Sequence, residues 1–322
     1  MRNLAGSPDS ALLTDIEAHA VEIARGAGAM LERDFGSSLK IEYKDEAKTD
    51  PVTQVDKEVQ TYLKEAILDR FPDHGVLGEE GRDDEGPARE FMWVLDPLDG
   101  TKNYINGLPL YSSSIGVMHR ASPIAGALYI PWPSKGNGVV LHARTGGGAF
   151  MDEEPLSVAD SPEPRGNSLV ALPGPWMAML RFAKPMRGKL GDVRVTGSIA
   201  YELAMTAKGV FQYTITLTPH LWDIAAGAAV VGEAGGLVML GHRPRGLRSL
   251  VASIRWEPAG SLVPSWRDGE TTLADLRSWS MPMAFGAPGP VRYVTSNIRT
   301  RSTLRRRFTR RLRGMARRKD HR

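Results

Sequence analysis

The sequence predicts an α/β protein with one large domain or two modest ones. Three observations support this prediction. Apolar residues recur at helical spacing in 9–35 and 49–72, as on the buried face of a helix. Short apolar runs near 74–80 and 89–100 end in acidic residues, as strands leading into a polar site would. Predicted helices then alternate with strands from about 168 to 240.

The elements of the N-terminal half follow in order. The first helix over 9–35 can be capped by Asp9 or Ser10. The second helix spans 49–72 and ends at Pro72. We predict strands where polar and apolar residues alternate or where glycine turns join two segments. The predicted strands lie at 41–44, 74–80 and 89–100, with a strand pair through 110–133 and hairpins in 136–158.

The C-terminal part is harder to assign. Residues 241–290 are rich in Gly, Pro, Arg and Trp and are predicted to be irregular. Leu304, Phe308, Leu312 and Met315 suggest a basic amphipathic helix, with Asn297 as a cap. We therefore expect an N-terminal α+β part over 1–160, an α/β part over 161–298 and a basic tail over 299–322.

Charge is unevenly distributed along the 322 residues. The net charge is +4, and residues 299–322 alone carry eleven Arg and one Lys against Asp320, which is +11. Subtracting +11 from +4 leaves the first 298 residues with −7. The tail could be a helix of the fold, an extension without fixed structure, or a binding segment for anionic lipid, nucleic acid or a protein.

Composition excludes several classes of chemistry. The chain has no cysteine, which removes disulfides, thiolate metal sites and cysteine nucleophiles. It has no apolar run long enough to cross a bilayer, and its N-terminus lacks an apolar signal segment. A cytoplasmic protein is expected. Hydrophobic content of 42% and charge of 24% are ordinary for a globular chain that can bury a sizeable core.

Acidic residues follow apolar runs at four places. They are Asp50 and Asp56 in "TDPVTQVD", Glu79 and Glu80 in "LGEE", Asp96 and Asp99 in "VLDPLDG", and Asp223 in "LWDIAAG". A single such acid is usually a turn or cap residue. Four stretches together indicate a site, because acids are rarely buried unless they are paired or bind metal. Carboxylates without cysteine, or histidine at ligand spacing, suit a hard cation such as Mg²⁺.

Gly100 and Thr101 add a second feature. They lead from the strand into a turn or short helix, and backbone N–H groups at a helix start can hold phosphate oxygens. A metal site beside an anion site indicates phosphoryl chemistry. Several carboxylates that converged without a metal would repel one another and raise their pKa values.

Two long stretches carry a resemblance to a known family. "WVLDPLDGTKNYINGLP" (93–109) and "LWDIAAGAAVVGEAGG" (221–236) are supported by "DPVTQVD", "GEE", "ARTGGGAF" and "GSIAYELAMTAKGVFQ", in family order over roughly residues 10–240. The chain resembles the inositol monophosphatase family of Mg²⁺-dependent, lithium-sensitive phosphatases. The resemblance implies a layered α-β-α-β-α sandwich, two or three Mg²⁺ ions, a small phosphorylated metabolite as substrate, and a homodimer.

The resemblance also implies roles for residues. Glu79, Asp96, Asp99, Asp223 and the Leu98 carbonyl would bind the metals. Asp56 and Thr101 would orient the attacking water, and Glu79 joins them among the catalytic residues. Attack would be direct, without a phosphoenzyme. The substrate and its phosphate would contact Gly100, Thr101, Gly197, Ser198 and Thr216, and Lys44 would match a basic residue near the site.

One position departs from the family pattern. Inositol-cleaving relatives carry a Glu that binds sugar hydroxyls seven residues before the Asp of "WD", where this chain has Thr216. One hydroxyl cannot replace a carboxylate as a polyol ligand. Inositol phosphate is therefore less favoured, and fructose 1,6-bisphosphate, histidinol phosphate and 3′-phosphoadenosine 5′-phosphate remain as alternatives.

Several roles stay open at this point. His220 could touch substrate or be structural, and Trp222 is expected to pack beside Asp223. Glu80 could contact a metal ligand or be a solvated neighbour, and the first is favoured. The competing hypothesis for the whole chain is a non-catalytic anion-binding module that uses its basic tail. Retention of Glu79, Asp96, Asp99 and Asp223 favours the enzyme.

Overall fold

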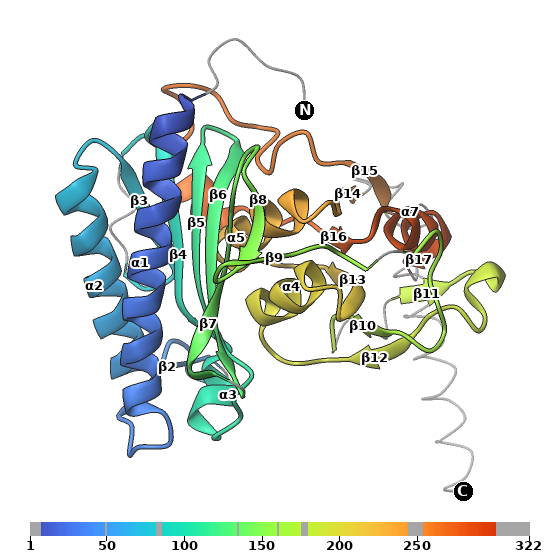
Figure 1. Ribbon diagram of the computed structural model, residues 1–322, viewed down its shortest axis with the longest axis horizontal. Coiled ribbons are helices and arrows are strands. Elements are labelled where there is room, and N and C mark those ends of the chain that lie inside the picture. Colours follow the sequence, from blue (N-terminus) through green and yellow to red (C-terminus); the bar gives the residue numbers. More distant parts are fainter. Residues whose placement is uncertain are drawn as a thin grey trace, which may run out of the picture.

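The structure is a computed structural model that describes residues 8–48, 50–81, 86–133, 135–159, 161–174, 180–243 and 254–300. These residues form five layers in the order helices, sheet, helices, sheet, helix (Figure 1). The predicted α/β class and the layered α-β-α-β-α sandwich are confirmed. In the part of the chain that is described, no helix has both the length and the apolar character needed to span a bilayer.

The larger sheet positions most of the site. In the described residues its strand order is β3-β4-β5-β6-β7-β8-β9. Its strands are β3 (Gly75–Gly78), β4 (Phe91–Asp99), β5 (Ser112–His119), β6 (Ser122–Trp132), β7 (Lys135–Arg144), β8 (Gly148–Met151) and β9 (Glu154–Pro155). Among the described strands of this sheet only β3 and β4 pair in parallel, with Gly78 opposite Leu95. Their carboxyl ends therefore coincide, and Glu79 comes to lie beside Asp96.

Helices α1 (Ser10–Asp34) and α2 (Gln54–Arg70) cover the outer face of this sheet (Figure 1). Their apolar faces pack with Trp93, Ile115 and Tyr129 in one core. The second helix was predicted to begin at residue 49, and this is wrong. Residues Pro51–Thr53 form strand β2 and pair with β1 (Ile41–Tyr43), because the Thr53 side chain caps the helix and the extended chain before it completes a hairpin.

Helices α4 (Ile199–Ala207) and α5 (Leu221–Glu233) form the middle layer between the two sheets. Helix α5 is apolar on almost every side and packs in the core that joins both sheets. It approaches the larger sheet at two glycines, since a Cβ on Gly116 would lie 2.6 Å from the Cβ of Ala225, and one on Gly126 would lie 2.5 Å from the carbonyl oxygen of Ala226. This close approach places the start of α5 over the end of β4.

The second sheet has the order β12-β10-β13-β16-β14-β15 in the described residues. Its strands are β10 (Leu169–Ala171), β12 (Asp192–Arg194), β13 (Phe211–Thr216), β14 (Leu237–His242), β15 (Arg255–Pro258) and β16 (Met283–Gly286). Helix α7 (Pro288–Asn297) covers its outer face and packs Val291 and Val294 into a third core. A separate pair, β11 (Leu180–Phe182) and β17 (Ile298–Thr300), lies beside it, next to a 3₁₀ turn at Lys184–Met186.

Two predictions for the C-terminal part are wrong. The described residues of 241–290, which are 241–243 and 254–290, are not irregular throughout: they contain β15, helix α6 (Leu273–Ser278) and β16, which lies between β13 and β14. Strand β16 is buried throughout, so it shows no alternation of polar and apolar residues to mark it. Asn297 does not cap a tail helix, because it ends α7 and residues 298–300 pair with β11. Residues 301–322 of the tail lie outside the described residues. The predicted division near residue 160 stays a proposal.

Candidate active site

A pocket of about 330 Å³ lies where β3 and β4 end and α5 begins. Seven of the residues proposed for the site line it together: Glu79, Asp96, Leu98, Asp99, Gly100, Thr101 and Asp223. Lys44, Asp50, His220 and Trp222 complete the lining. Residues up to 179 positions apart in the sequence are thus brought into one cavity.

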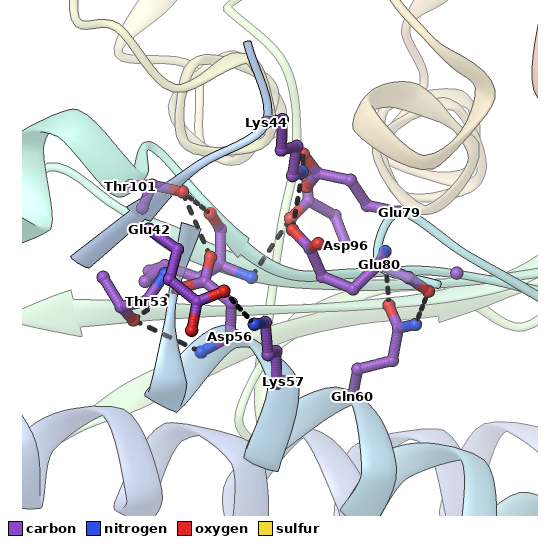
Figure 2. Close-up of polar contacts among 12 residues, drawn as sticks. Glu42, Lys44, Thr53, Asp56, Lys57, Gln60, Glu79, Glu80, Asp96 and Thr101 are labelled. Carbon is purple, nitrogen blue, oxygen red and sulfur yellow. Dashed lines mark hydrogen bonds and ion pairs between the residues drawn. The ribbon is translucent and has the colours of Figure 1, made fainter. Parts of the chain in front are cut away.

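Four predicted residues do not line this pocket. Asp56 lies behind it and accepts a hydrogen bond from the Thr101 hydroxyl at 3.2 Å (Figure 2). Ser198 is buried and supports Asp99, and Gly197 precedes it at a positive φ of 84° beside Asn103. Thr216, on β13, is only 4% exposed, and within the described residues its hydroxyl has no hydrogen-bond partner. The predicted substrate contacts of Gly197, Ser198 and Thr216 stay predictions.

The end of β4 turns sharply into the pocket. The backbone N–H of Leu98 donates to the Asp96 carboxylate at 3.1 Å, and the Thr101 hydroxyl lies 3.0 Å from the Leu98 carbonyl oxygen. Gly100 has φ 94°, and a Cβ there would lie 2.9 Å from the carbonyl oxygen of Leu110. Only glycine adopts this conformation in this space without strain. Helix α3 (Thr101–Ile105) starts immediately afterwards, which agrees with the predicted turn or short helix.

Two pocket carboxylates also cap helices. Asp99 Oδ2 accepts from the Ser198 hydroxyl at 2.9 Å and from the Ala200 N–H at 2.5 Å, at the start of α4. Asp223 Oδ2 accepts from the His220 N–H at 2.8 Å, at the start of α5. These three bonds all reach the Oδ2 atom of their aspartate.

Asp56 plays the same part for a third helix. Its Oδ2 accepts from the backbone N–H and the hydroxyl of Thr53, which closes a capping box at the start of α2. Helices α2, α4 and α5 therefore begin around the pocket, and the positive ends of their dipoles favour anions there. Sequence analysis missed this double role, although "TQVD" (53–56) has the capping-box spacing that could have revealed it.

Burial and mutual repulsion govern the charge of the pocket. The pKa of Asp96 is raised well above its usual value by burial and by the charges of Glu79, Asp99 and Asp223. Burial and the charge of Asp99 raise the pKa of Asp223 in the same way. The pKa of Asp99 is raised to about 7, chiefly by burial and also by the charge of Glu79, although the hydrogen bonds from Ala200 and Ser198 lower it. The pocket thus concentrates negative charge that a cation would stabilise.

Lys44 supplies positive charge at one side of the pocket. Its ammonium lies 2.8 Å from Glu79 Oε1 and 2.6 Å from Glu80 Oε1 (Figure 2). Burial lowers the pKa of Lys44, but its hydrogen bonds to the two carboxylates and their charges raise it above the ordinary value. The β1–β2 hairpin delivers this lysine, since the Lys44 N–H donates to the Asp50 carbonyl oxygen. The hairpin also explains how Asp50, to which sequence analysis assigned no role, reaches the lining.

The donor chemistry of the pocket fits a hard cation. Three buried or half-buried aspartates and one glutamate line the same cavity as Leu98, and carboxylate and carbonyl oxygens suit Mg²⁺. Nevertheless, among the residues described here no three His, Cys, Asp or Glu side chains are arranged to hold one metal ion together. The glutamate is instead paired with Lys44.

A buried glutamate next to the pocket gives a test of these electrostatics. Glu202, 6% exposed, accepts hydrogen bonds from the N–H and hydroxyl of Thr196. Burial, together with the charge of Asp99, raises its pKa from 4.5 to about 7. The folded state then binds a proton more tightly than the unfolded state, so the free energy of unfolding falls as pH rises from 4.5 through 7.

We therefore expect Glu202→Gln to be more stable than the wild type at pH 8, by on the order of 2 kcal/mol, and nearly equal at pH 5. Urea unfolding at both pH values measures the difference. Glu65→Gln, at an exposed position on α2, is the control and should change neither value. A stability difference that is the same at both pH values would contradict the assigned pKa.

The fold and the pocket define the class of this protein, which is a layered α/β protein with a carboxylate-lined cavity. Comparisons with known proteins agree with this class. The sequence profile of the inositol monophosphatase family matches residues 12–275. The chain is 34% identical over 234 residues to the fructose-1,6-bisphosphatase/inositol-1-monophosphatase of Aquifex aeolicus, covering 71% of this chain and 87% of that protein. This chain belongs to the inositol monophosphatase family.

Two further proteins are similar to this chain. The Nus factor SuhB of Haemophilus influenzae is 33% identical over 224 residues, which are 68% of this chain and 82% of that protein. A solved IMPase/NADP phosphatase, complexed with Mg²⁺ and phosphate, superposes with a TM-score of 0.65 at 19% identity, over 88% of this chain and 95% of that one. That structure shares the fold of this chain.

Proposed function

We propose that this chain is a Mg²⁺-dependent phosphomonoesterase that hydrolyses a small phosphorylated metabolite by direct attack of water. The observation that carries the proposal is the convergence of Asp96, Asp99, Asp223 and Glu79 on one pocket with the start of α3. Carboxylates beside a helix start suit a metal and a phosphate at adjacent positions. A family relative that was solved with Mg²⁺ and phosphate supports the same combination.

The metal-binding set would be Glu79, Asp96, Asp99, Asp223 and the Leu98 carbonyl oxygen, holding two or three Mg²⁺ ions. When bound, Mg²⁺ would lower the pKa of a water molecule and offset the negative charge of the phosphate. The protein prepares this set by tying Oδ2 of Asp99 and Asp223 to helix starts. Both carboxylates are thereby held in one orientation, as metal ligands require.

Asp56 and Thr101 would orient the attacking water. The Thr101 hydroxyl lies 3.2 Å from Asp56 Oδ1, and the other Asp56 oxygen is fixed by Thr53. Burial raises the pKa of Asp56, which makes its carboxylate a better proton acceptor than an exposed one. The Thr101 hydroxyl could then accept a hydrogen bond from water while it donates to Asp56. The N–H groups of Gly100 and Thr101 would hold the phosphate.

The substrate is proposed by class. Thr216 replaces the glutamate expected for polyol binding and is buried outside the pocket lining, which lowers the expectation for inositol phosphate. Fructose 1,6-bisphosphate, histidinol phosphate and 3′-phosphoadenosine 5′-phosphate remain candidates. His220 and Trp222 contribute a stacked aromatic pair to the lining, 4.5 Å between ring centres. The pair gives the substrate side of the pocket an apolar wall.

Phosphate release from a panel of substrates tests the proposal. The panel contains inositol monophosphate, fructose 1,6-bisphosphate, histidinol phosphate and 3′-phosphoadenosine 5′-phosphate, each with Mg²⁺, with EDTA, and with Mg²⁺ plus lithium. We expect release from at least one compound that requires Mg²⁺ and is reduced by lithium, with inositol monophosphate not the best substrate. Absence of release from every compound would contradict the proposal.

That negative outcome would favour a second candidate, a non-catalytic anion-binding module. A relative named for a Nus factor shows that this family includes proteins named for other roles. In this candidate the basic tail would bind an anionic surface or nucleic acid. Retention of all four proposed metal-binding carboxylates argues for the enzyme. A homodimer, a cytoplasmic location and lithium sensitivity accompany the enzyme as proposals.

A further inference from the structure

Helix α6 brings Arg277 next to Glu79, one of the residues that line the pocket. A capping box between Thr272 and Asp275 starts the helix, and Leu276 is buried in the central core. Two backbone hydrogen bonds join the start of this helix to the β3–β4 connection. The Ala88 N–H donates to the Thr271 carbonyl oxygen at 2.8 Å, and the Leu273 N–H donates to the Gly86 carbonyl oxygen at 3.1 Å. The helix is therefore fixed beside the end of β3.

Arg277 reaches from this helix to the strand end. Its guanidinium donates from Nη2 to the Gly78 carbonyl oxygen at 2.8 Å and from Nη1 to the Glu79 carbonyl oxygen at 3.1 Å. The two acceptors are consecutive, so one planar group spans the turn from which the Glu79 side chain leaves. A rigid fork of donors suits such a pair of acceptors better than a single ammonium does.

The same guanidinium contacts the other side of the site. Its Cζ atom lies 5.4 Å from the ring centre of Trp222, and a cation over an indole is attractive at this distance. Trp222 immediately precedes Asp223 and stacks with His220. Arg277 thus connects the backbone of Glu79, on the β3 side, with the residue next to Asp223, on the α5 side. Its positive charge also faces the acidic pair Glu79 and Glu80.

We propose that Arg277 is a positioning residue that sets the distance between Glu79 and Asp223 for metal binding. The inference rests on the proposed Mg²⁺-dependent function. Arg277 is not among the residues that line the pocket, and it contacts the backbone of Glu79 and the ring of Trp222, which do line it. It lies two residues beyond the part of the chain that the family profile matches.

Mn²⁺ binding to the full-length protein tests this role, with the metal alone as the probe. Isothermal titration compares the wild type with Arg277→Met, Arg277→Lys and the control Arg267→Met. Arg267 belongs to the same region, is 77% exposed and pairs with Glu270. Residues that orient metal ligands typically change affinity by about 10- to 100-fold. We expect Arg277→Met to weaken Mn²⁺ binding about tenfold, Arg277→Lys to weaken it less, and Arg267→Met to leave it unchanged.

Three outcomes separate the possibilities. A wild type that binds no Mn²⁺ overturns the proposed function, and this inference with it. If the wild type binds and the folded Arg277→Met protein binds equally well, only the positioning role is overturned. Should Arg277→Met fail to fold, Arg277→Lys decides, because it keeps the charge and cannot span both carbonyls. Unchanged binding in that variant overturns the role, and weaker binding with an unaltered melting temperature supports it.

Discussion

Replacing Asp96 by Asn is expected to abolish activity and to make the metal-free protein more stable. Asp96 is 2% exposed and is surrounded by Glu79, Asp99 and Asp223, whose charges raise its pKa. Loss of a proposed metal-binding carboxylate should reduce Mg²⁺-dependent phosphate release by more than about 100-fold, the upper end for residues that only orient ligands. Phosphate release on the best panel substrate measures the loss.

The stability gain has a separate cause. Without metal at pH 8, the wild type keeps like charges close together in a buried site, which costs free energy. Asn retains a side-chain oxygen that can accept from the Leu98 N–H and carries no charge. We expect the free energy of unfolding in EDTA to rise by roughly 1 kcal/mol or more, and each kcal/mol corresponds to about 2–4 °C in Tm. Asp69→Asn, at an exposed position on α2, should change neither activity nor Tm. An active Asp96→Asn protein would refute the assignment of Asp96 as a metal ligand.

Mg²⁺ is expected to raise the thermal stability of the wild type strongly at pH 8 and weakly at pH 6. Binding to the folded state alone stabilises it by about 2.7 kcal/mol at 100 times Kd. The pKa of Asp99 is about 7, and those of Asp96 and Asp223 are raised well above their usual values. As pH falls through 7 the Asp99 carboxylate binds a proton, which the ion must displace. Metal affinity is therefore highest above pH 7 and decreases below it.

The size of this effect follows from one displaced proton. For a group with a pKa of about 7, the half-saturating Mg²⁺ concentration should rise about tenfold between pH 8 and pH 6. Melting curves over a Mg²⁺ series at both pH values measure it, with NaCl at matched ionic strength as the control for screening. Equal half-saturation at the two pH values would show that the buried aspartates do not bind the ion.

These predictions share a structural basis. Asp56, Asp99 and Asp223 each use one carboxylate oxygen to accept a hydrogen bond at the start of a helix. The same bonds lower the pKa of Asp99, while burial and neighbouring charge raise it. The protein thus holds these three aspartates in place with hydrogen-bond donors at helix starts, and not by pairing each one with a positive charge. Fixed orientation is the property that a metal ligand needs.

The sequence by itself determined the class of fold and most of the site. Helical spacing of apolar residues located α1 and the body of α2, and acids at the ends of apolar runs located Glu79, Asp96, Asp99 and Asp223. These signals are local, because a strand end and the polar residues after it are neighbours in the chain. The two long motifs then indicated the family, which the family profile confirmed.

Only the tertiary structure decided which residues meet. The parallel register of β3 and β4 brings Glu79 beside Asp96, and the β1–β2 hairpin carries Lys44 to the same place. Strand β16 escaped prediction because a fully buried strand has no polar alternation, and its partners β13 and β14 lie far away in sequence. Arg277 gave no signal at all. Its acceptors are backbone carbonyls nearly 200 residues earlier. Every residue has a backbone carbonyl, so the amino-acid type does not reveal which one accepts a hydrogen bond.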